Sequence, residues 1–131
     1  MRSVLIASVL LLSACTPAVT VPRQPFDDIP VPREWTRYSL ESVITTTPQA
    51  TSAKLLYFSQ SGVDESLDQA RQLLLGEGWK QTKSERFVNR EGFPGVWAEF
   101  AKAEDVTRVT AVEGAHATHV EYAIARVTRS P

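Results

Sequence analysis

The most reactive side chain in the sequence is the thiol of Cys15, the only cysteine among 131 residues. A thiolate can act as a nucleophile, bind a metal or pair with a second thiol. Because the chain holds no second cysteine, it cannot form an internal disulfide. The small residues Ser13 and Ala14 directly precede Cys15 and suit an extended chain entering a peptidase cleft. The pattern predicts that Cys15 is a site of processing and covalent modification.

Residues 1–14 have the organisation of a signal peptide. A basic residue, Arg2, is followed by an apolar run from Val4 to Leu12 and then by small residues, which is the order found in secretory leaders. The run is much shorter than the roughly 20 apolar residues that a membrane-spanning helix needs. We therefore expect residues 1–14 to be removed, so that Cys15 becomes the first residue of the mature protein.

Leu12-Ser13-Ala14-Cys15 resembles the lipobox of bacterial lipoproteins, in which the thiol receives a diacylglyceryl group, the leader is cleaved and the new amino terminus is acylated, for example with palmitate. The resemblance implies a stable membrane anchor at Cys15, since two or three acyl chains hold a protein on a bilayer. Thr16, rather than aspartate, follows the cysteine, which implies the outer membrane in a Gram-negative host, with the protein facing the periplasm or the cell exterior. The alternative is an ordinary secretory leader followed by an unrelated cysteine.

His116, His119 and Glu121 form the only cluster with the side chains of a metal site. Residues three apart on a strand point to opposite faces, so the two histidines converge only if His116 lies in a turn at Gly114-Ala115. His119 and Glu121 share a face, but two ligands make a weak site. We expect solvated polar residues on a hairpin, and we assign no metal or cofactor.

Other catalytic patterns are missing from the sequence. No serine stands in a Gly-x-Ser-x-Gly elbow, and no glycine-rich loop could cradle a phosphate. A formal net charge of −1 argues against nucleic acid as a partner. Paired carboxylates fall in the tether, at a helix start and in a turn; they are Asp27-Asp28, Asp64-Glu65 and Glu104-Asp105. Tryptophans that could line a carbohydrate or peptide groove are more typical of core or rim packing; they are Trp35, Trp79 and Trp97. We therefore expect a protein that is not an enzyme.

Residues 15–33 combine the modified cysteine with a proline-rich tether that holds Pro17, Pro22, Pro25, Pro30 and Pro32. Proline lacks a backbone donor and has a fixed φ, which excludes a central strand and favours an extended chain. We predict a spacer up to about Gln24 and a segment docked on the domain after Phe26. The folded domain is expected over residues 34–131 as a single unit.

One helix is predicted within Ser61 to Trp79. Val63, Leu67, Ala70 and Leu74 recur at the spacing of a single apolar stripe. Acidic residues crowd the first turns, where negative charge complements the helix dipole. Gly78 suits the left-handed position after the last turn, and Trp79 can then fold back on the helix end.

Segments rich in Thr, Val, Tyr, Phe and Ile predict six strands. Their ranges are Tyr38–Thr46, Ala53–Gln60, Lys80–Asn89, Val96–Lys102, Val106–Glu113 and Thr118–Thr128. Short connections between the last four imply antiparallel neighbours. The predicted fold is α+β, a two-layer sandwich of order ββαββββ with one helix on an antiparallel sheet.

The second strand is predicted to be apolar on both faces, because Leu55 and Tyr57 point one way while Leu56 and Phe58 point the other. A single helix covers one face only. The docked segment, with Phe26 or Trp35, is the first candidate to cover the other face, and a partner protein or ligand is the second.

The mature chain resembles a family of small bacterial lipoproteins with a domain of unknown function. Four short motifs carry the resemblance: Ile29-Pro30-Val31-Pro32, Leu55-Leu56-Tyr57-Phe58, Gly78-Trp79 and Glu99-Phe100-Ala101-Lys102. The resemblance implies the fold and the anchor and carries over no catalytic residue.

Three functions remain open from the sequence. The first is a non-catalytic envelope module that presents a sheet surface or edge to another envelope protein. The second is a small-ligand or lipid binder that uses the helix-free sheet face around Leu56 and Phe58. The third is a metal protein or hydrolase built around His116 and His119. A concave apolar pocket on the helix-free face would favour the second over the first.

Overall fold

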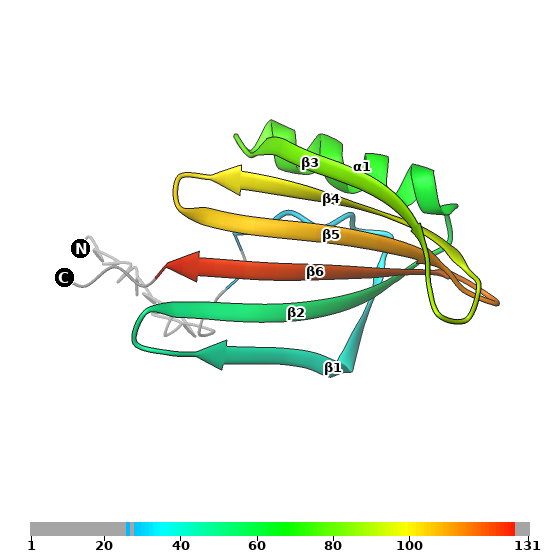
Figure 1. Ribbon diagram of the computed structural model, residues 1–131, viewed down its shortest axis with the longest axis horizontal. Coiled ribbons are helices and arrows are strands. Elements are labelled where there is room, and N and C mark those ends of the chain that lie inside the picture. The colour runs from blue at the N-terminus through cyan, green and yellow to red at the C-terminus, as the bar shows by residue number, and fades with distance from the viewer. Residues whose placement is uncertain (1–25, 27, 128–131) are drawn as a thin grey trace, which may run out of the picture.

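The computed structural model describes residue 26 and residues 28–127, with residues 39–43 described by their backbone alone. Cys15, Thr16, the predicted leader and the predicted spacer up to Gln24 lie outside the described residues. Within them, one helix packs on an antiparallel sheet (Figure 1), which confirms the predicted α+β class. The elements are β1 (Thr36–Thr46), β2 (Ala50–Ser59), α1 (Val63–Gly76), β3 (Lys80–Val88), β4 (Pro94–Lys102), β5 (Asp105–Glu113) and β6 (Thr118–Val127).

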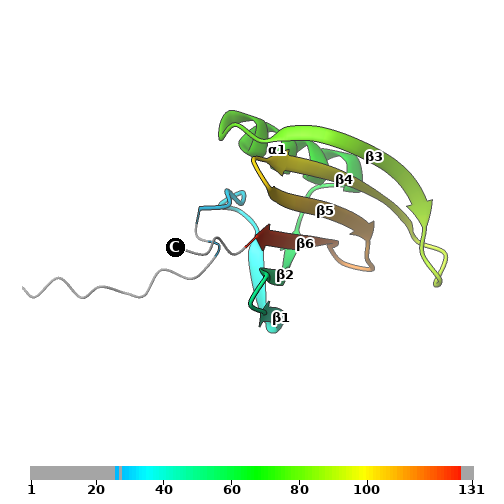
Figure 2. The same ribbon diagram turned by 60° about the vertical axis from the view of Figure 1, so that its left-hand side comes forward.

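The strands lie side by side in the order β1-β2-β6-β5-β4-β3, and every neighbouring pair is antiparallel. Hairpins join β3 to β4, β4 to β5 and β5 to β6, so the last strand returns to pair with β2. The sheet twists strongly, so that β1 and β2 are seen nearly end-on in Figure 2 while β3 runs across the picture.

The observed strands begin and end within three residues of their predicted limits. The largest shift is at the start of β2, which begins at Ala50 rather than Ala53. Thr47 explains this shift, because its backbone N–H donates to the Ala50 carbonyl at 2.8 Å and its hydroxyl accepts from the Ala50 N–H at 3.1 Å. The turn through Pro48 and Gln49 is therefore tight, and strand pairing resumes at once.

The predicted helix is present, and its apolar stripe faces the sheet, with Leu67, Ala70 and Leu74 fully buried. Its end has the expected left-handed glycine, Gly78, at φ +91°. The Trp79 N–H donates to the Leu74 carbonyl at 3.0 Å and the Gly78 N–H to the Leu75 carbonyl at 3.2 Å, which is the Schellman arrangement. Trp79 is thereby folded back into the core, where 3% of its surface is exposed.

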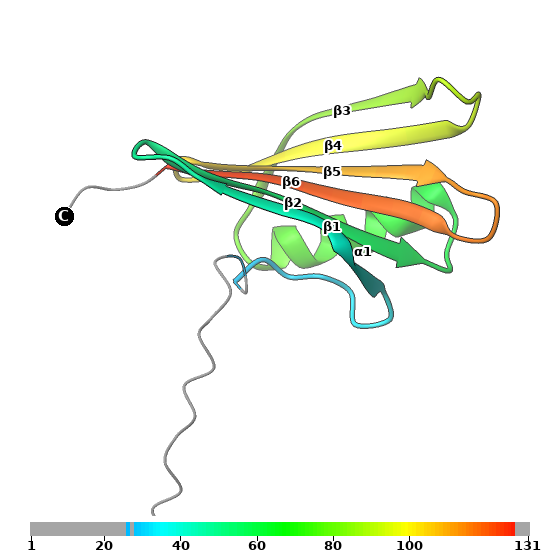
Figure 3. The same cartoon turned by 90° about the horizontal axis from the view of Figure 1, so that it is seen from below.

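The residues before β1 form a docked segment, defined as Phe26 and residues 28–35, on the same face of the sheet as α1 (Figure 3). Phe26, Ile29 and Trp35 belong to the buried core. The Trp35 ring lies 6.2 Å from the rings of both Tyr57 on β2 and Tyr122 on β6. Its indole N–H also donates to the side-chain oxygen of Gln69 on α1 at 3.2 Å.

The docked segment therefore does not cover the second face of the sheet, and that prediction was wrong. The reason is the position of α1, which packs mainly against β4 and β5. Without the docked segment, the large rings of Tyr57 and Tyr122 would be exposed beside the helix. The docked segment buries these rings within the core.

Candidate functional site: the helix-free face of the sheet

The helix-free face consists of the alternate strand residues that point away from α1 and the docked segment. The strand register places these residues in rows that cross the sheet. One row contains Trp97, Thr110, Glu121, Leu56 and Tyr38, and all five side chains are partly buried by their neighbours. Leu56 and Phe58 point to this face, while Leu55 and Tyr57 are in the core, as the alternation predicts.

Aromatic rings pack edge to face at one end of the helix-free face. The Phe58 ring lies 5.3 Å from the ring of Tyr38 on β1 and 5.0 Å from the imidazole of His119 on β6, at interplanar angles of 74° and 80°. Such pairs favour a rigid cluster. This end of the face is therefore an ordered apolar surface.

Trp97 forms the second part of the site, near the middle of the same face. The guanidinium of Arg108 lies 4.1 Å from the centre of its ring and the ammonium of Lys83 lies 5.6 Å from it. Arg108 also forms an ion pair with Glu99 at 3.2 Å. The stacked cations hold the indole in place, and the residue stays partly exposed.

A shallow hollow of about 470 Å³ lies at the opposite end of the sheet from Phe58. Its lining is dominated by small or apolar side chains; it comprises Thr45, Ser52, Ala53, Lys54, Val106, Ala123, Ile124 and Ala125. The small side chains of Ala123 and Ala125 leave this space on β6. Neither Leu56 nor Phe58 lines the hollow, and its lining comes from four strands whose register only the structure defines.

The two histidines occupy different environments. His116 is exposed in the turn between β5 and β6, which is the position that convergence of the two histidines requires. The ring of His119, however, packs edge to face against the ring of Phe58. A side chain at Gly114 would collide with the His119 ring and with the Ala117 carbonyl, so glycine allows the turn to close. Among residues 26 and 28–127, no group of three or more His, Cys, Asp or Glu side chains is placed to hold a metal.

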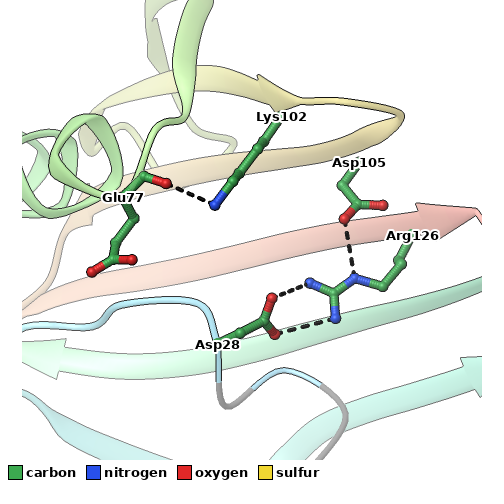
Figure 4. A network of polar contacts seen from close by, with 5 residues as sticks. All are labelled: Asp28, Glu77, Lys102, Asp105 and Arg126. Carbon is green, nitrogen blue, oxygen red and sulfur yellow. Dashed lines mark hydrogen bonds and ion pairs between the residues drawn. The ribbon is translucent and has the colours of Figure 1, made fainter.

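Three of the paired carboxylates, Asp28, Asp64 and Asp105, are ion-pair partners. Asp64 at the start of α1 pairs with Arg86 on β3 at 2.7 Å. Asp105 accepts from the Nε of Arg126 at 3.2 Å. Figure 4 shows that the same guanidinium also holds Asp28 of the docked segment. Asp27 lies outside the described residues.

Arg126 forms the main group of charged contacts at the end of the sheet where β6 ends. Hydrogen bonds from Arg126 hold the pKa of the Asp28 carboxyl below its ordinary value. The same contacts raise the pKa of Arg126. Nearby, the Lys102 ammonium donates to the Glu77 carbonyl at the end of α1 at 2.7 Å (Figure 4), where a cation complements the helix dipole. These contacts join the docked segment to β5 and β6, and α1 to β4.

Of the three tryptophans, Trp35 and Trp79 are core residues and Trp97 lies on the helix-free face. The expectation of core or rim packing is met by Trp35 and Trp79 in the core, and Trp97 packs against Arg108 at the surface of the sheet. The alternation of Trp97 with the buried Val96 and Ala98 could have revealed this, because neighbouring strand residues face opposite ways.

Comparison with known proteins defines neither a family nor a function. No family model and no curated protein matches the sequence. The chain is similar to a solved structure of a Pseudomonas aeruginosa protein of unknown function, described as proposed to be a regulator. The two share 17% identity over 74% of this chain and 72% of that chain, with a TM-score of 0.47. In the described part of the chain, no helix has the length and apolar character needed to span a bilayer.

Proposed function

We propose that this protein is a bacterial lipoprotein, anchored through Cys15, whose helix-free face binds another envelope protein without catalysis. In a Gram-negative host we place it in the outer membrane, because Thr16 follows the cysteine. The observation that carries the proposal is the set of partly buried side chains on the helix-free face around Leu56, Phe58 and Trp97.

This set has the composition of an interaction surface. Aromatic residues and arginine are enriched at the energetic centres of protein interfaces. Here Trp97 and Phe58 are held in fixed orientations by Arg108 and His119. Ordering these side chains in the free protein reduces the conformational entropy lost on binding.

The face is a better contact surface than either sheet edge. The outer strand β3 carries Lys80, Lys83, Glu85 and Arg86, and charged side chains oppose the addition of a further strand. The other outer strand, β1, is interrupted by an irregularity between Tyr38 and Val43. Both features disfavour strand addition, so we assign the contact to the face.

The anchor is tested by Cys15→Ala in the native host. We expect the variant to be released from membranes or to accumulate as an uncleaved precursor. Metabolic labelling with a palmitate analogue measures acylation directly, and membrane fractionation measures partitioning. Unchanged acylation, processing and partitioning would refute the anchor.

The contact surface is tested by a photo-crosslinking amino acid placed at Phe58 in the intact envelope. Leu75 is a matched control, because it is an apolar residue of α1 with 47% of its surface exposed. We expect one discrete crosslinked species from position 58 that is lost in Trp97→Ser, and none from position 75. Equal crosslinking from both positions, or a product that is insensitive to Trp97→Ser, would contradict the proposal.

A further inference from the structure

The charge of the side chains on the helix-free face changes from one row to the next along the strands, toward the hairpin that joins β4 to β5. The row beyond Trp97 holds Lys83, Glu99, Arg108, Ala123 and Lys54. It contains three cations and one carboxylate. The next row holds Ala101, Val106, Ala125, Ser52 and Thr45, and its one charged residue is Lys80 on the outer strand β3. Because rows two residues apart are separated by about 7 Å, a row with three cations directly borders one that is uncharged from β4 to β1.

The hollow spans both rows, since its lining includes Lys54 and Ala123 from the first and Val106 and Ala125 from the second. Val106 and Val127 stand beside Ala125 with 37% and 45% of their surfaces exposed, although valine is a residue type that is usually buried. Lys54 is the only charged residue in the lining of the hollow. A ligand with an apolar part and an adjacent negative charge fits this combination.

The same end of the sheet receives the chain that leads back to Cys15. Arg126 follows Ala125 on β6 and binds Asp28 of the docked segment, and its guanidinium lies 5.5 Å from the ring of Phe26. Residues 15–25 can span at most about 40 Å. An anchor at Cys15 therefore allows this end of the domain to reach the bilayer.

We propose that this end of the helix-free face rests on the phospholipid surface of the membrane that holds the anchor. The hollow beside Val106 and Ala125 accepts part of an acyl chain, and Lys54 in its lining meets a lipid phosphate about 7 Å away along the strand. This spacing matches an interfacial contact, in which apolar groups enter about 5–10 Å into the headgroup and acyl boundary. The inference rests on the lipid anchor of the proposed function.

The lipid contact and the protein contact use different ends of one face. Phe58 lies in the row of Val112 and His119, three rows from Val106, and hence about 20 Å away along the strands. A partner bound at Phe58 and Leu56 leaves the hollow free for lipid. The bilayer contact would then orient the aromatic end of the face away from the membrane.

Site-specific spin labelling of the acylated protein tests this contact. Because the Cys15 thiol is consumed by lipidation, a cysteine introduced by Ala125→Cys is the only free thiol. Ala125 is exposed, so the label is compatible with folding. Glu91→Cys, in the exposed turn between β3 and β4, is the matched control. Both proteins are reconstituted in vesicles of phosphatidylethanolamine and phosphatidylglycerol.

We expect the label at position 125 to be relaxed by lipid-soluble oxygen and shielded from a water-soluble nickel complex, and the label at position 91 to show the reverse. Lys54→Glu should return the label at position 125 toward the aqueous pattern. Aqueous accessibility at position 125 in protein that floats with the vesicles would overturn the lipid contact and leave the anchor intact. Failure of the protein to float would instead refute the anchor and, with it, this inference.

Discussion

Two guanidinium nitrogens of Arg126 on β6 donate to the two carboxylate oxygens of Asp28 in the docked segment, at 3.1 Å and 2.6 Å. A bidentate pair fixes geometry more firmly than a single contact. The Nε of the same guanidinium donates to Asp105 at the start of β5. One arginine therefore joins the beginning of the described chain to the last two strands.

The first prediction concerns this pair. Asp28→Asn should lower the free energy of unfolding at neutral pH by about 0.5–1 kcal/mol, because the Asp28 side chain is 61% exposed and solvent weakens exposed ion pairs. The folded-state pKa of Asp28 is depressed, so its contribution is present above the unfolded carboxyl pKa and is lost as the pH falls through the folded value. Urea unfolding at neutral pH and below about pH 3 measures the difference. Equal differences at both pH values would contradict this assignment.

The second prediction concerns Phe26, which precedes the first strand by ten positions but is buried. Phe26→Ala should lower the free energy of unfolding by about 3 kcal/mol, because it leaves a cavity in the core. Phe93→Ala is the matched control, since Phe93 lies in a turn with 38% exposure, and it should cost less than half as much. Denaturant midpoints at a common slope check the comparison, and equal costs would show that the docked segment does not belong to the core.

The third prediction concerns the Thr107 hydroxyl on β5. It is fully buried and has no hydrogen-bond partner among the described residues. Thr107→Val should raise the free energy of unfolding by about 1 kcal/mol, because an unsatisfied buried polar group is costly. Thr118→Val is the opposite case, since its hydroxyl donates to the Ser61 carbonyl at 2.6 Å, and it should be destabilising. Thermal unfolding of both variants gives the signs; a loss of stability in Thr107→Val would contradict the prediction.

The fold class was largely predictable because local patterns and tertiary packing agree. The stripe of Leu67, Ala70 and Leu74 faces the sheet as expected, and Gly78 ends the helix in the predicted conformation. The alternation of Leu55 and Leu56 places one side chain on each face. These features follow from the residue periodicity of helices and strands, which is the same wherever the element packs.

The use of each face was less predictable, because it depends on which elements compete for the same apolar surface. The sequence identifies Phe26 and Trp35 as docking residues. The face on which they dock is set by the rings of Tyr57 and Tyr122 beside α1. The pairing of Trp97 with Arg108 likewise depends on the register of β4 against β5, which no single segment encodes.

Hydroxyl-radical footprinting of Trp97 and Phe58 tests the central claim, that the helix-free face contacts an envelope protein, most directly. The oxidation rates are compared between the native envelope and the purified lipoprotein in phospholipid vesicles, with Phe93 as an exposed reference. We expect both residues to be oxidised several-fold more slowly in the envelope, with Phe93 unchanged, because only the envelope supplies the partner. Equal rates for Trp97 and Phe58 in the two preparations would contradict the account.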